Sequence, residues 1–385
     1  MSKYLIIGSH AEQLLNFRGD LIRHLQSRGH EVLTASPPAE SSAVDQRFTS
    51  WGVRRIDLVM DRTGVSIVAD LRLLSQIRTM LRAEKPDLVL AYTIKPVIYG
   101  ALAARLAGQP PMVAMITGLG LAFSEPTSLR QWLVRKFART LYDWAMRCTQ
   151  VVIFQNPDDE ADFRRHGLLH AHHRVEQTNG SGVNLQRFAA APLPKQPFRF
   201  LMIARLLVDK GVREYIAAAS LLRQVYPEIE CHLVGPFDPN PAALSQAEIA
   251  AATASGTIIH HGFTRDVRPH LDQCHVYVLP SYREGTPRSV LEALAVGRPV
   301  ITTDAPGCRE TVINGLNGLL VPVGSAAPLA DAMRHMVELP AEALIAMGAA
   351  SRQLAESRFD VVAVNGKLAT ILEELLIADN VEVRQ

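Results

Sequence analysis

The sequence has no long hydrophobic run and few cysteines. No stretch reaches the ~18 uninterrupted apolar residues of a membrane span, and the apolar run at residues 4–7 is too short for a signal peptide. The cysteines lie far apart, without a Cys-x-x-Cys pair, at Cys148, Cys231, Cys274 and Cys308. Such spacing disfavours a disulfide framework and a zinc site, so a cytoplasmic protein is expected, with any membrane contact peripheral.

Clustered acidic residues are also scarce. Mg²⁺ and Mn²⁺ prefer sites with several oxygen ligands, and only the segment 158–162, which contains four acidic residues, offers such a cluster. It follows Asn156 and Pro157, a pair typical of a helix start, where acidic residues complement the helix dipole. We therefore expect no metal site, no cofactor and a metal-independent reaction.

The length and composition favour two globular domains. A chain of 385 residues with 48% apolar and 20% charged residues is long enough for two ordinary domains with sizeable cores. The net charge of +2 is uneven, because residues 1–190 carry +6 and residues 191–385 carry −4. The basic half suits an anionic partner or is simply a solvated surface, and its charge density is too low for a nucleic-acid-binding domain.

Apolar runs recur in both halves of the chain with helical patterns between them. In the first half they predict a strand at 4–7, a helix at about 17–28 and further strands at 30–35, 88–91, 112–116 and 151–154. Three prolines in segment 192–197 predict a linker. In the second half we expect strands at 200–203, 230–234, 258–260, 276–279 and 300–302, with helices near 211–225, 289–296 and 326–338. The α/β fold class, with domains at 1–190 and 191–360, follows from this alternation.

The segment 280–295 carries the most chemical information. It is predicted to follow a strand and to open a helix, and backbone N–H groups at such a helix start attract phosphate. Glu284 lies in the turn, where its carboxylate is able to accept hydrogen bonds from sugar hydroxyls, and Glu292 lies eight residues later, in reach of a ribose diol. The residues expected to bind a nucleotide sugar here are Gly285, Thr286, Pro287, Arg288 and Glu292.

This segment resembles the Glu-x7-Glu motif of glycosyltransferase family 4. The spacing of Glu284 and Glu292 matches, the similarity continues through 297–303, 304–312 and 317–322, and it covers nearly the whole chain. The resemblance implies a GT-B fold, with two Rossmann-like domains facing across a cleft, and a retaining, nucleotide-sugar-dependent glycosyltransferase whose C-terminal domain holds the donor. It also implies that residues 361–385 form a helix crossing back to the first domain.

A basic pair accompanies the motif. In family members the residues that match Arg205 and Lys210 neutralise the donor diphosphate, whose negative charge must be stabilised as the glycosidic bond breaks. The alternative is a solvated arginine and lysine flanking a helix start. We assign Glu284, Arg205 and Lys210 as candidate catalytic residues, and we add Gly235, Phe263 and Val267 to the donor-binding set.

The N-terminal half departs from the family pattern. Where relatives often have a glycine-rich loop, this chain has Gly8 and then Gly19, and where many have a histidine after the strand at 113–116 it reads Thr117-Gly118. The candidate residues for binding the acceptor are Gly8, Ser9, His10, Asn16, Arg18, Lys95, Thr117 and Gly118. Asn16 and Arg18 are placed at the opening of the helix after the first strand. Lys95 is placed at the end of another strand, as a ligand for an acceptor phosphate or as an ordinary surface lysine.

The segment 129–147 combines five basic residues and one acidic residue with two Trp, a Phe and a Tyr. Such a helix either lies in an anionic membrane interface or packs on the sheet with a solvated face. The segments 93–96 and 180–183 look most like bacterial family 4 enzymes that extend polyprenyl-diphosphate-linked sugars. This likeness implies transfer of a hexose or N-acetylhexosamine from a UDP-sugar to a lipid-linked glycan, for surface polysaccharide or glycoconjugate synthesis, at the inner face of the cell membrane.

Two other functions remain open on the sequence alone. A nucleotide-sugar epimerase shares this architecture, and a non-catalytic protein would bind the sugar nucleotide without turnover. A nicotinamide dehydrogenase is disfavoured, because the first strand is not followed by Gly-x-Gly-x-x-Gly.

Overall fold

The computed structural model describes residues 1–61, 66–108, 110–119, 129–240 and 242–382. It divides into two compact units, Met1–Ser181 with Ala363–Gln385, and Gly182–Val362. The proline-rich segment 192–197, where the sequence suggested a linker, belongs to the second unit.

The first unit is built on a seven-stranded sheet among the described residues, in the order β3-β2-β1-β4-β5-β6-β7, and all of its strand pairs are parallel. Its strands are β1 Lys3–Ile7, β2 Glu31–Ser36, β3 Arg54–Asp57, β4 Leu88–Tyr92, β5 Met112–Ile116, β6 Val151–Phe154 and β7 Arg174–Gln177. Its helices are α1 Ala11–Ser27, α2 Ser42–Ser50, α3 Ile67–Glu84, α4 Ile94–Ala107, α5 Leu129–Met146, α6 Pro157–Arg165 and α13 Val361–Glu382.

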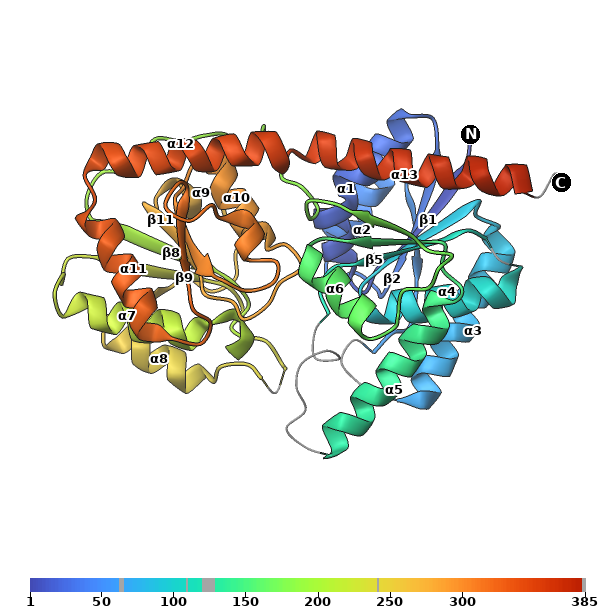
Figure 1. Ribbon diagram of the computed structural model, residues 1–385, viewed down its shortest axis with the longest axis horizontal. Coiled ribbons are helices and arrows are strands. Elements are labelled where there is room, and N and C mark those ends of the chain that lie inside the picture. Colours follow the sequence, from blue (N-terminus) through green and yellow to red (C-terminus); the bar gives the residue numbers. More distant parts are fainter. Residues whose placement is uncertain (62–65, 109, 120–128, 241, 383–385) are drawn as a thin grey trace. The chain divides into compact units, whose positions relative to one another are not determined.

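Helices lie on both sides of this sheet (Figure 1), and an apolar layer fills the space between the sheet and the helices on each face. Alternate residues of a strand point to opposite faces, so Leu5 and Ile7 pack toward α3 and α4, whereas Tyr4 and Ile6 pack toward α1 and α13. Helix α13 is held there by an ion pair and a hydrogen bond as well, since Glu373 accepts from Arg28 at 2.8 Å and lies 3.0 Å from His30 Nε2.

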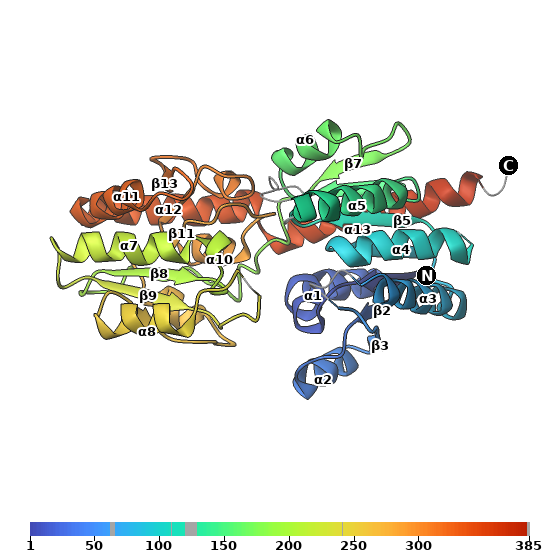
Figure 2. The ribbon, with the colours of Figure 1, turned by 90° about the horizontal axis from the view of Figure 1, so that it is seen from below.

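The second unit has a six-stranded sheet among the described residues, again with parallel pairing, in the order β10-β9-β8-β11-β12-β13. Its strands are β8 Arg199–Ile203, β9 Glu230–Val234, β10 Ile259–His260, β11 Val276–Leu279, β12 Val300–Thr303 and β13 Gly318–Val321. Its helices are α7 Val212–Arg223, α8 Gln246–Ala254, α9 Arg268–Asp272, α10 Arg288–Val296, α11 Ala326–Glu338 and α12 Ala341–Arg358, with short 3₁₀ turns at Val208–Lys210 and Arg309–Thr311. Figure 2 shows α7 and α8 with β8 and β9 between them.

The predicted α/β class is confirmed, and most predicted elements lie within a residue or two of their observed bounds. One helix start was wrong. Helix α1 begins at Ala11 rather than near residue 17, because its buried positions Ala11 and Leu14 already continue the helical spacing of Leu21 and Leu25. Asn16 and Arg18 therefore lie inside the helix and do not open it.

A buried histidine makes the second unit sensitive to acid. His275 is 6% exposed, its Nδ1 accepts from the backbone N–H of Arg199 at 3.1 Å, and its ring stacks on Phe198. Burial, aided by the nearby charge of Arg298, lowers the pKa of His275 to about 4. A histidine held neutral in the fold contributes stability above its unfolded pKa of 6.5, and this contribution is lost as pH falls toward 4.

We predict that His275→Asn weakens the pH dependence of stability between about pH 6.5 and 4, because asparagine keeps an acceptor near the place of Nδ1 but takes up no proton. Urea unfolding of the full chain at several pH values measures this dependence. His335→Gln, which alters an exposed histidine of α11, is the control and should retain the wild-type slope. Equal slopes for His275→Asn and wild type would contradict the prediction.

Candidate active site

A cluster of charged residues lies at the carboxyl ends of β8 and β11 in the second unit. In open parallel sheets, this edge is where ligands bind. The Oε1 atom of Glu284 accepts hydrogen bonds from Lys210 Nζ at 2.6 Å and from Ser281 Oγ at 2.8 Å. The side chains of Lys210 and Glu284 are 17% and 16% exposed. The structure thus brings together the two sequence-predicted residues Lys210 and Glu284.

Backbone contacts fix the turns that carry this pair. The turn after β8 is tied to the turn after β11 because Tyr282 donates its N–H to the carbonyl of Asp209 at 2.8 Å. Gly211 has a φ of +74°, and a Cβ there would lie 2.0 Å from the carbonyl oxygen of Pro280. Glycine is therefore required for this close approach.

A third turn, which follows β12, packs against Glu284. The backbone N–H of Glu284 donates to the carbonyl of Pro306 at 2.9 Å. Gly307 has a φ of +78°, and a Cβ there would lie 2.2 Å from the carbonyl oxygen of Glu284. The position of the Glu284 carboxylate thus depends on a glycine more than twenty residues away in sequence.

The protonation of Lys210 is governed by its partner. Burial lowers the pKa of Lys210, but the charge and hydrogen bond of Glu284 outweigh it and hold this pKa above its ordinary value. Arg205 is close enough for its charge to act on Lys210 as well. Lys210 is therefore a cation at neutral pH.

Glu292 is the second carboxylate of the motif. It lies in the second turn of α10, is 12% exposed, and accepts a hydrogen bond from Arg288 Nε at 3.0 Å. Burial raises the pKa of Glu292, and the charges of Arg288 and Arg187 oppose the rise. Burial also raises the pKa of Tyr277, and both Glu292 and Glu284 add to the rise. The two carboxylates therefore act on the same buried tyrosine.

Arg205 follows β8, the strand that pairs with β11. It is 47% exposed and donates from Nη1 to Asp238 Oδ2 at 2.9 Å. Asp238 is a residue of this edge that the sequence did not reveal, since it lies in a loop without a recognisable motif. Ser281 and Arg187 were also missed, although Ser281 immediately precedes the Tyr-Arg-Glu segment of the motif.

The other expected donor residues lie around the same edge. Gly285, Thr286 and Pro287 form the turn before α10, and Pro287 is the N-cap residue. Gly235 follows β9, where a Cβ would lie 1.8 Å from the carbonyl oxygen of Ala204. Phe263 is 67% exposed and follows β10, and Val267 is the N-cap residue of α9.

Four of the acceptor candidates lie at strand ends of the first unit. Gly8 and Ser9 follow β1, and Thr117 and Gly118 follow β5. Gly8 lies against Tyr92, whose hydroxyl would be 2.3 Å from an added Cβ. These residues therefore share the carboxyl edge of the first sheet.

Of the charged and polar acceptor candidates, His10 follows β1 as expected, whereas Asn16, Arg18 and Lys95 are placed differently from the expectation. His10 is the N-cap residue of α1, and its Nδ1 lies 3.5 Å from Glu12. Asn16 is exposed on α1, whereas Arg18 is 2% exposed and packs over the ring of Tyr92. Lys95 is the second residue of α4 rather than a strand end, and it pairs with Asp70 at 2.8 Å.

Arg18 and Lys95 are therefore tied into the fold of the first unit. Arg18 is buried because its position shares the inward face of α1 with Leu14 and Leu25. Lys95 is 15% exposed, which rules out the ordinary surface lysine that the sequence had left open.

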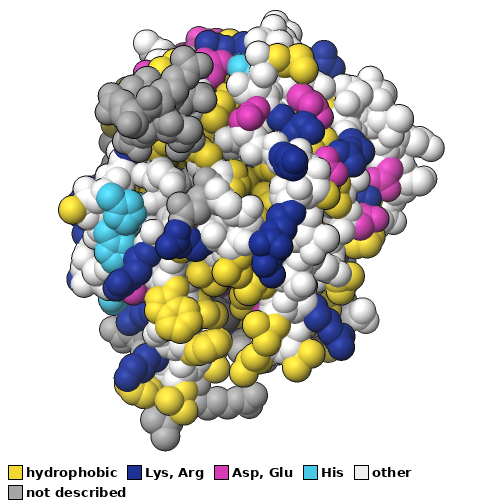
Figure 3. All heavy atoms as spheres, turned by 90° about the vertical axis from the view of Figure 1, so that its right-hand side faces the viewer, with side chains coloured by type: hydrophobic (Ala, Val, Ile, Leu, Met, Phe, Trp, Pro, Cys, Tyr) yellow, Lys and Arg dark blue, Asp and Glu magenta, His cyan; other side chains and the backbone are white. Residues whose placement is uncertain are grey.

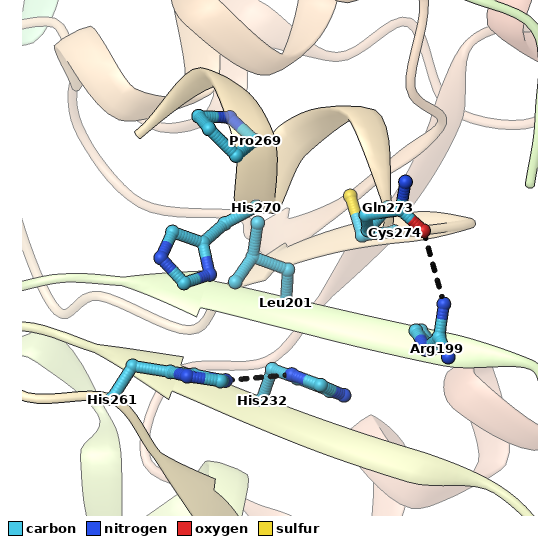
Figure 4. A pocket seen from close by; sticks show the side chains of 8 residues that line it. All are labelled: Arg199, Leu201, His232, His261, Pro269, His270, Gln273 and Cys274. Atoms are coloured by element: carbon cyan, nitrogen blue, oxygen red, sulfur yellow. Dashed lines mark hydrogen bonds between the residues drawn. The ribbon is translucent and has the colours of Figure 1, made fainter. Parts of the chain in front are cut away.

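A separate hollow of about 360 Å³ lies in the second unit, and its lining residues are labelled in Figure 4. His232 and His261 share a hydrogen bond of 2.8 Å, and Arg199 donates to Gln273 at 3.2 Å. Neither carboxylate of the Glu-x7-Glu motif lines this hollow, and neither do Arg205 and Lys210, so it is separate from the site that the sequence predicts.

Within the described ranges, no group of three or more His, Cys, Asp or Glu side chains could hold a metal ion. The acidic segment after Asn156 is the first turn of α6, where Asn156 Oδ1 accepts from the N–H of Asp159 at 2.8 Å. No helix in the described part of the chain is long and apolar enough to cross a bilayer.

Two family models match the chain. The model "Glycosyl transferases group 1" matches residues 185–354, and the model "Glycosyl transferase 4-like domain" matches residues 17–180. Together they extend over both compact units.

Curated relatives are similar over most of the chain. An N,N'-diacetylbacillosaminyl-diphospho-undecaprenol alpha-1,3-N-acetylgalactosaminyltransferase from Campylobacter jejuni is 28% identical over 86% of this chain and 88% of its own length. A UDP-Gal:alpha-D-GlcNAc-diphosphoundecaprenol alpha-1,3-galactosyltransferase from Escherichia coli is 25% identical over 71% of this chain and 72% of its own length.

Solved structures share the fold. A sucrose-phosphate synthase from Thermosynechococcus elongatus aligns with a TM-score of 0.80 and 20% identity over 98% of this chain and all (100%) of its own. HepE from Anabaena, solved with UDP and glucose, aligns with a TM-score of 0.76 and 20% identity over 97% of this chain and 100% of its own. These likenesses support the expected GT-B fold.

We predict that Gly307→Ala destabilises the second unit more than Gly315→Ala does. Both glycines have similar positive φ values, +78° and +81°, so both variants should lose about 1–2 kcal/mol from backbone strain. Only at Gly307 does the new Cβ collide with the backbone of Glu284, which should add about 1–3 kcal/mol.

Urea unfolding of both variants and of wild type measures the difference. Gly315 is the matched control because nothing lies within 4 Å of its added Cβ. Equal losses in the two variants would show that the turn after β12 does not support Glu284 as described.

Proposed function

This chain belongs to the group 1 glycosyltransferases, and on that premise we propose that it transfers a sugar from a UDP-sugar to a hydroxyl of a polyprenyl-diphosphate-linked saccharide. The chain is a glycosyltransferase of the GT-B fold. The identity of the donor, the identity of the acceptor and the stereochemistry of transfer are proposals. The transferred sugar is a hexose or an N-acetylhexosamine, and the product serves the synthesis of a surface polysaccharide or glycoconjugate.

The observation that carries the proposal is the cluster at the carboxyl edge of the second sheet. Lys210 is a partly buried cation that lies 2.6 Å from Glu284, and the charge of Arg205 also acts on its pKa. A nucleoside diphosphate leaving group develops negative charge, and fixed cations in a partly desolvated site stabilise that charge strongly. The same edge offers Glu284 to sugar hydroxyls and Glu292 to a ribose.

The donor and acceptor classes are supported by the relatives. The Escherichia coli relative is named for a UDP-galactose donor and a diphosphoundecaprenol-linked acceptor, and the Campylobacter relative for a diphospho-undecaprenol acceptor. We propose that this chain uses the same classes of donor and acceptor. The donor then binds to the second unit, and the acceptor binds to the first at Gly8, Ser9, His10, Thr117 and Gly118.

We assign retention of configuration from the family. In the proposed reaction the acceptor hydroxyl attacks the anomeric carbon on the face from which UDP leaves, and the bond from the anomeric carbon to the β-phosphate oxygen breaks. The departing phosphate takes the proton of the acceptor hydroxyl. Arg205 and Lys210 neutralise the diphosphate, and on this basis we propose that no metal is required.

Helix α5 supports a peripheral contact with an anionic membrane. Five large hydrophobic side chains of this helix are exposed, namely Trp132, Leu133, Val134, Phe137 and Trp144. Basic side chains lie among them, and a hollow of about 600 Å³ is lined in part by Trp132, Arg135, Lys136 and Arg139. Figure 3 shows hydrophobic and basic side chains next to one another toward the lower end of the first unit.

We propose that these residues rest on the headgroups of the inner face of the cytoplasmic membrane, where a lipid-linked acceptor is found. Aromatic rings at headgroup level and basic residues against anionic lipid are the features of such a contact.

We predict that Glu284→Ala lowers sugar transfer at least about a hundredfold, because it removes the acceptor of sugar hydroxyls that is held between Lys210 and Ser281. Arg205→Ala should raise the barrier by about 2–4 kcal/mol through loss of charge stabilisation. The measurement offers uridine, guanosine and adenosine diphosphate sugars with polyprenyl-diphosphate-linked acceptors, in excess chelator.

Arg334→Ala, which alters an exposed arginine of α11, is the control and should leave the rate unchanged. Unchanged transfer in both site variants would refute the assigned roles. Activity that is lost in chelator and restored by Mn²⁺ would refute metal independence. Tight UDP binding without transfer to any acceptor would favour a non-catalytic binding protein.

We predict that the double variant Trp132→Ser/Phe137→Ser sediments roughly tenfold less with vesicles of phosphatidylglycerol and phosphatidylcholine, because it removes aromatic area from the membrane contact. Ile345→Ser, at an exposed apolar residue of α12, is the control and should sediment like wild type. If wild type did not sediment with these vesicles, the membrane contact would be disproved.

A further inference from the structure

Asp238 is a carboxylate at the carboxyl edge of the second sheet, where we propose that the donor binds. Neither the Glu-x7-Glu motif nor the proposed reaction requires it. It follows β9 and accepts a hydrogen bond from Arg205 Nη1 at 2.9 Å. Its partner is the cation to which we assign the donor diphosphate. An anion in contact with this cation occupies the guanidinium group that the diphosphate would use.

The loop that carries Asp238 is fixed against the turn after β8. Leu206 donates its N–H to the carbonyl of Pro236 at 3.2 Å, and Leu244 donates to the carbonyl of Leu206 at 2.8 Å. Val208 donates to the carbonyl of Ala242 at 3.0 Å. The missing Cβ of Gly235 lets the two chain segments approach this closely.

Within this loop the Asp238 side chain is also held. Its Oδ1 accepts the backbone N–H of Asn240 at 2.9 Å, and the side chain is 13% exposed. Arg205 is 47% exposed and has a longer, more flexible side chain. If the ion pair opens, Arg205 is therefore the partner that moves, while the Asp238 carboxylate stays fixed in its loop.

The contact differs from an ordinary ion pair between helix residues. Asp331 and Arg334 of α11 also pair at 2.9 Å, but they are three residues apart and 68% and 52% exposed. Arg205 and Asp238 are 33 residues apart and are brought together by two strand ends. Pairs of this kind form only when the surrounding fold holds both side chains in place. Asp238 is therefore a candidate for a role in the binding of the ligand of Arg205.

We propose that Asp238 competes with the donor diphosphate for Arg205 and thereby weakens the binding of UDP. This inference rests on the proposed function, since it takes UDP as the leaving group. In the empty site Asp238 balances the charge of Arg205. When UDP is bound, the guanidinium is shared between the diphosphate and Asp238, and the return of Arg205 to Asp238 favours release of UDP after transfer. Product release limits turnover in many enzymes, so weaker binding of UDP would speed turnover where its release is the slow step.

The test is UDP binding by calorimetry to the full chain, with Asp238→Asn beside wild type. Asparagine keeps the oxygen that accepts from Asn240 and removes the charge, so the loop should keep its fold. Breaking a partly exposed ion pair changes a binding constant by about fivefold. Because Asp238→Asn removes the pair that competes with UDP, this variant should bind UDP about fivefold more tightly. Asp331→Asn, which neutralises a carboxylate paired with arginine at the same distance, should bind like wild type.

A double-variant cycle shows whether Asp238 acts through Arg205. In the Arg205→Gln background, adding Asp238→Asn should leave the affinity for UDP unchanged. Equal or weaker binding by Asp238→Asn alone, or tightening that persists without Arg205, would overturn the inference while the proposed donor stands. If wild type bound no UDP, the proposed donor would be wrong and the inference would fail with it.

Discussion

The ion pair between Lys210 and Glu284 is the contact on which the candidate site depends. It joins the turn after β8 to the turn after β11 at 2.6 Å, and both side chains are largely buried. A buried charge is costly unless it is paired and hydrogen-bonded, and Glu284 raises the pKa of Lys210 and so keeps the ammonium protonated. Two glycines make the pair possible, since side chains at Gly211 and Gly307 would collide with Pro280 and Glu284. The glycines, the turns and the ion pair therefore form one unit.

The cations of this edge are matched to carboxylates. Lys210 pairs with Glu284, Arg205 with Asp238 and Arg288 with Glu292. A diphosphate that enters such a site exchanges partners rather than finding free charges, so its net affinity is smaller than the number of cations alone would imply. An enzyme that must hold a nucleotide sugar and then release the nucleotide benefits from that balance.

The sequence predicted best what depends on neighbouring residues. The strand Met112–Ile116 and the helix Ala326–Glu338 were predicted to the residue, because apolar spacing and flanking turns define them locally. Glu284 and Lys210 were found because each lies in a short motif after a strand. Strands β3 and β7 were not predicted, since Arg54–Asp57 and Arg174–Gln177 are largely polar and lie at the edges of the sheet.

Contacts between distant residues were beyond sequence reasoning. The partner of Arg205 lies 33 residues away, and the partner of Lys95 lies 25 residues before it. Neighbouring strand ends bring Arg205 to Asp238, and the packing of α3 against α4 brings Asp70 to Lys95. The burial of Arg18 was also not predicted, because an arginine in a helix is usually exposed, whereas this one lies on the buried face of α1 with Leu14 and Leu25.

A crystal structure of the full chain with bound UDP-sugar would examine the proposed donor site most directly. We expect the diphosphate within hydrogen-bonding distance of Arg205 and Lys210, a sugar hydroxyl on Glu284, and the ribose on Glu292. A diphosphate bound away from both cations, with the sugar not in contact with Glu284, would contradict the donor site and the mechanism built on it.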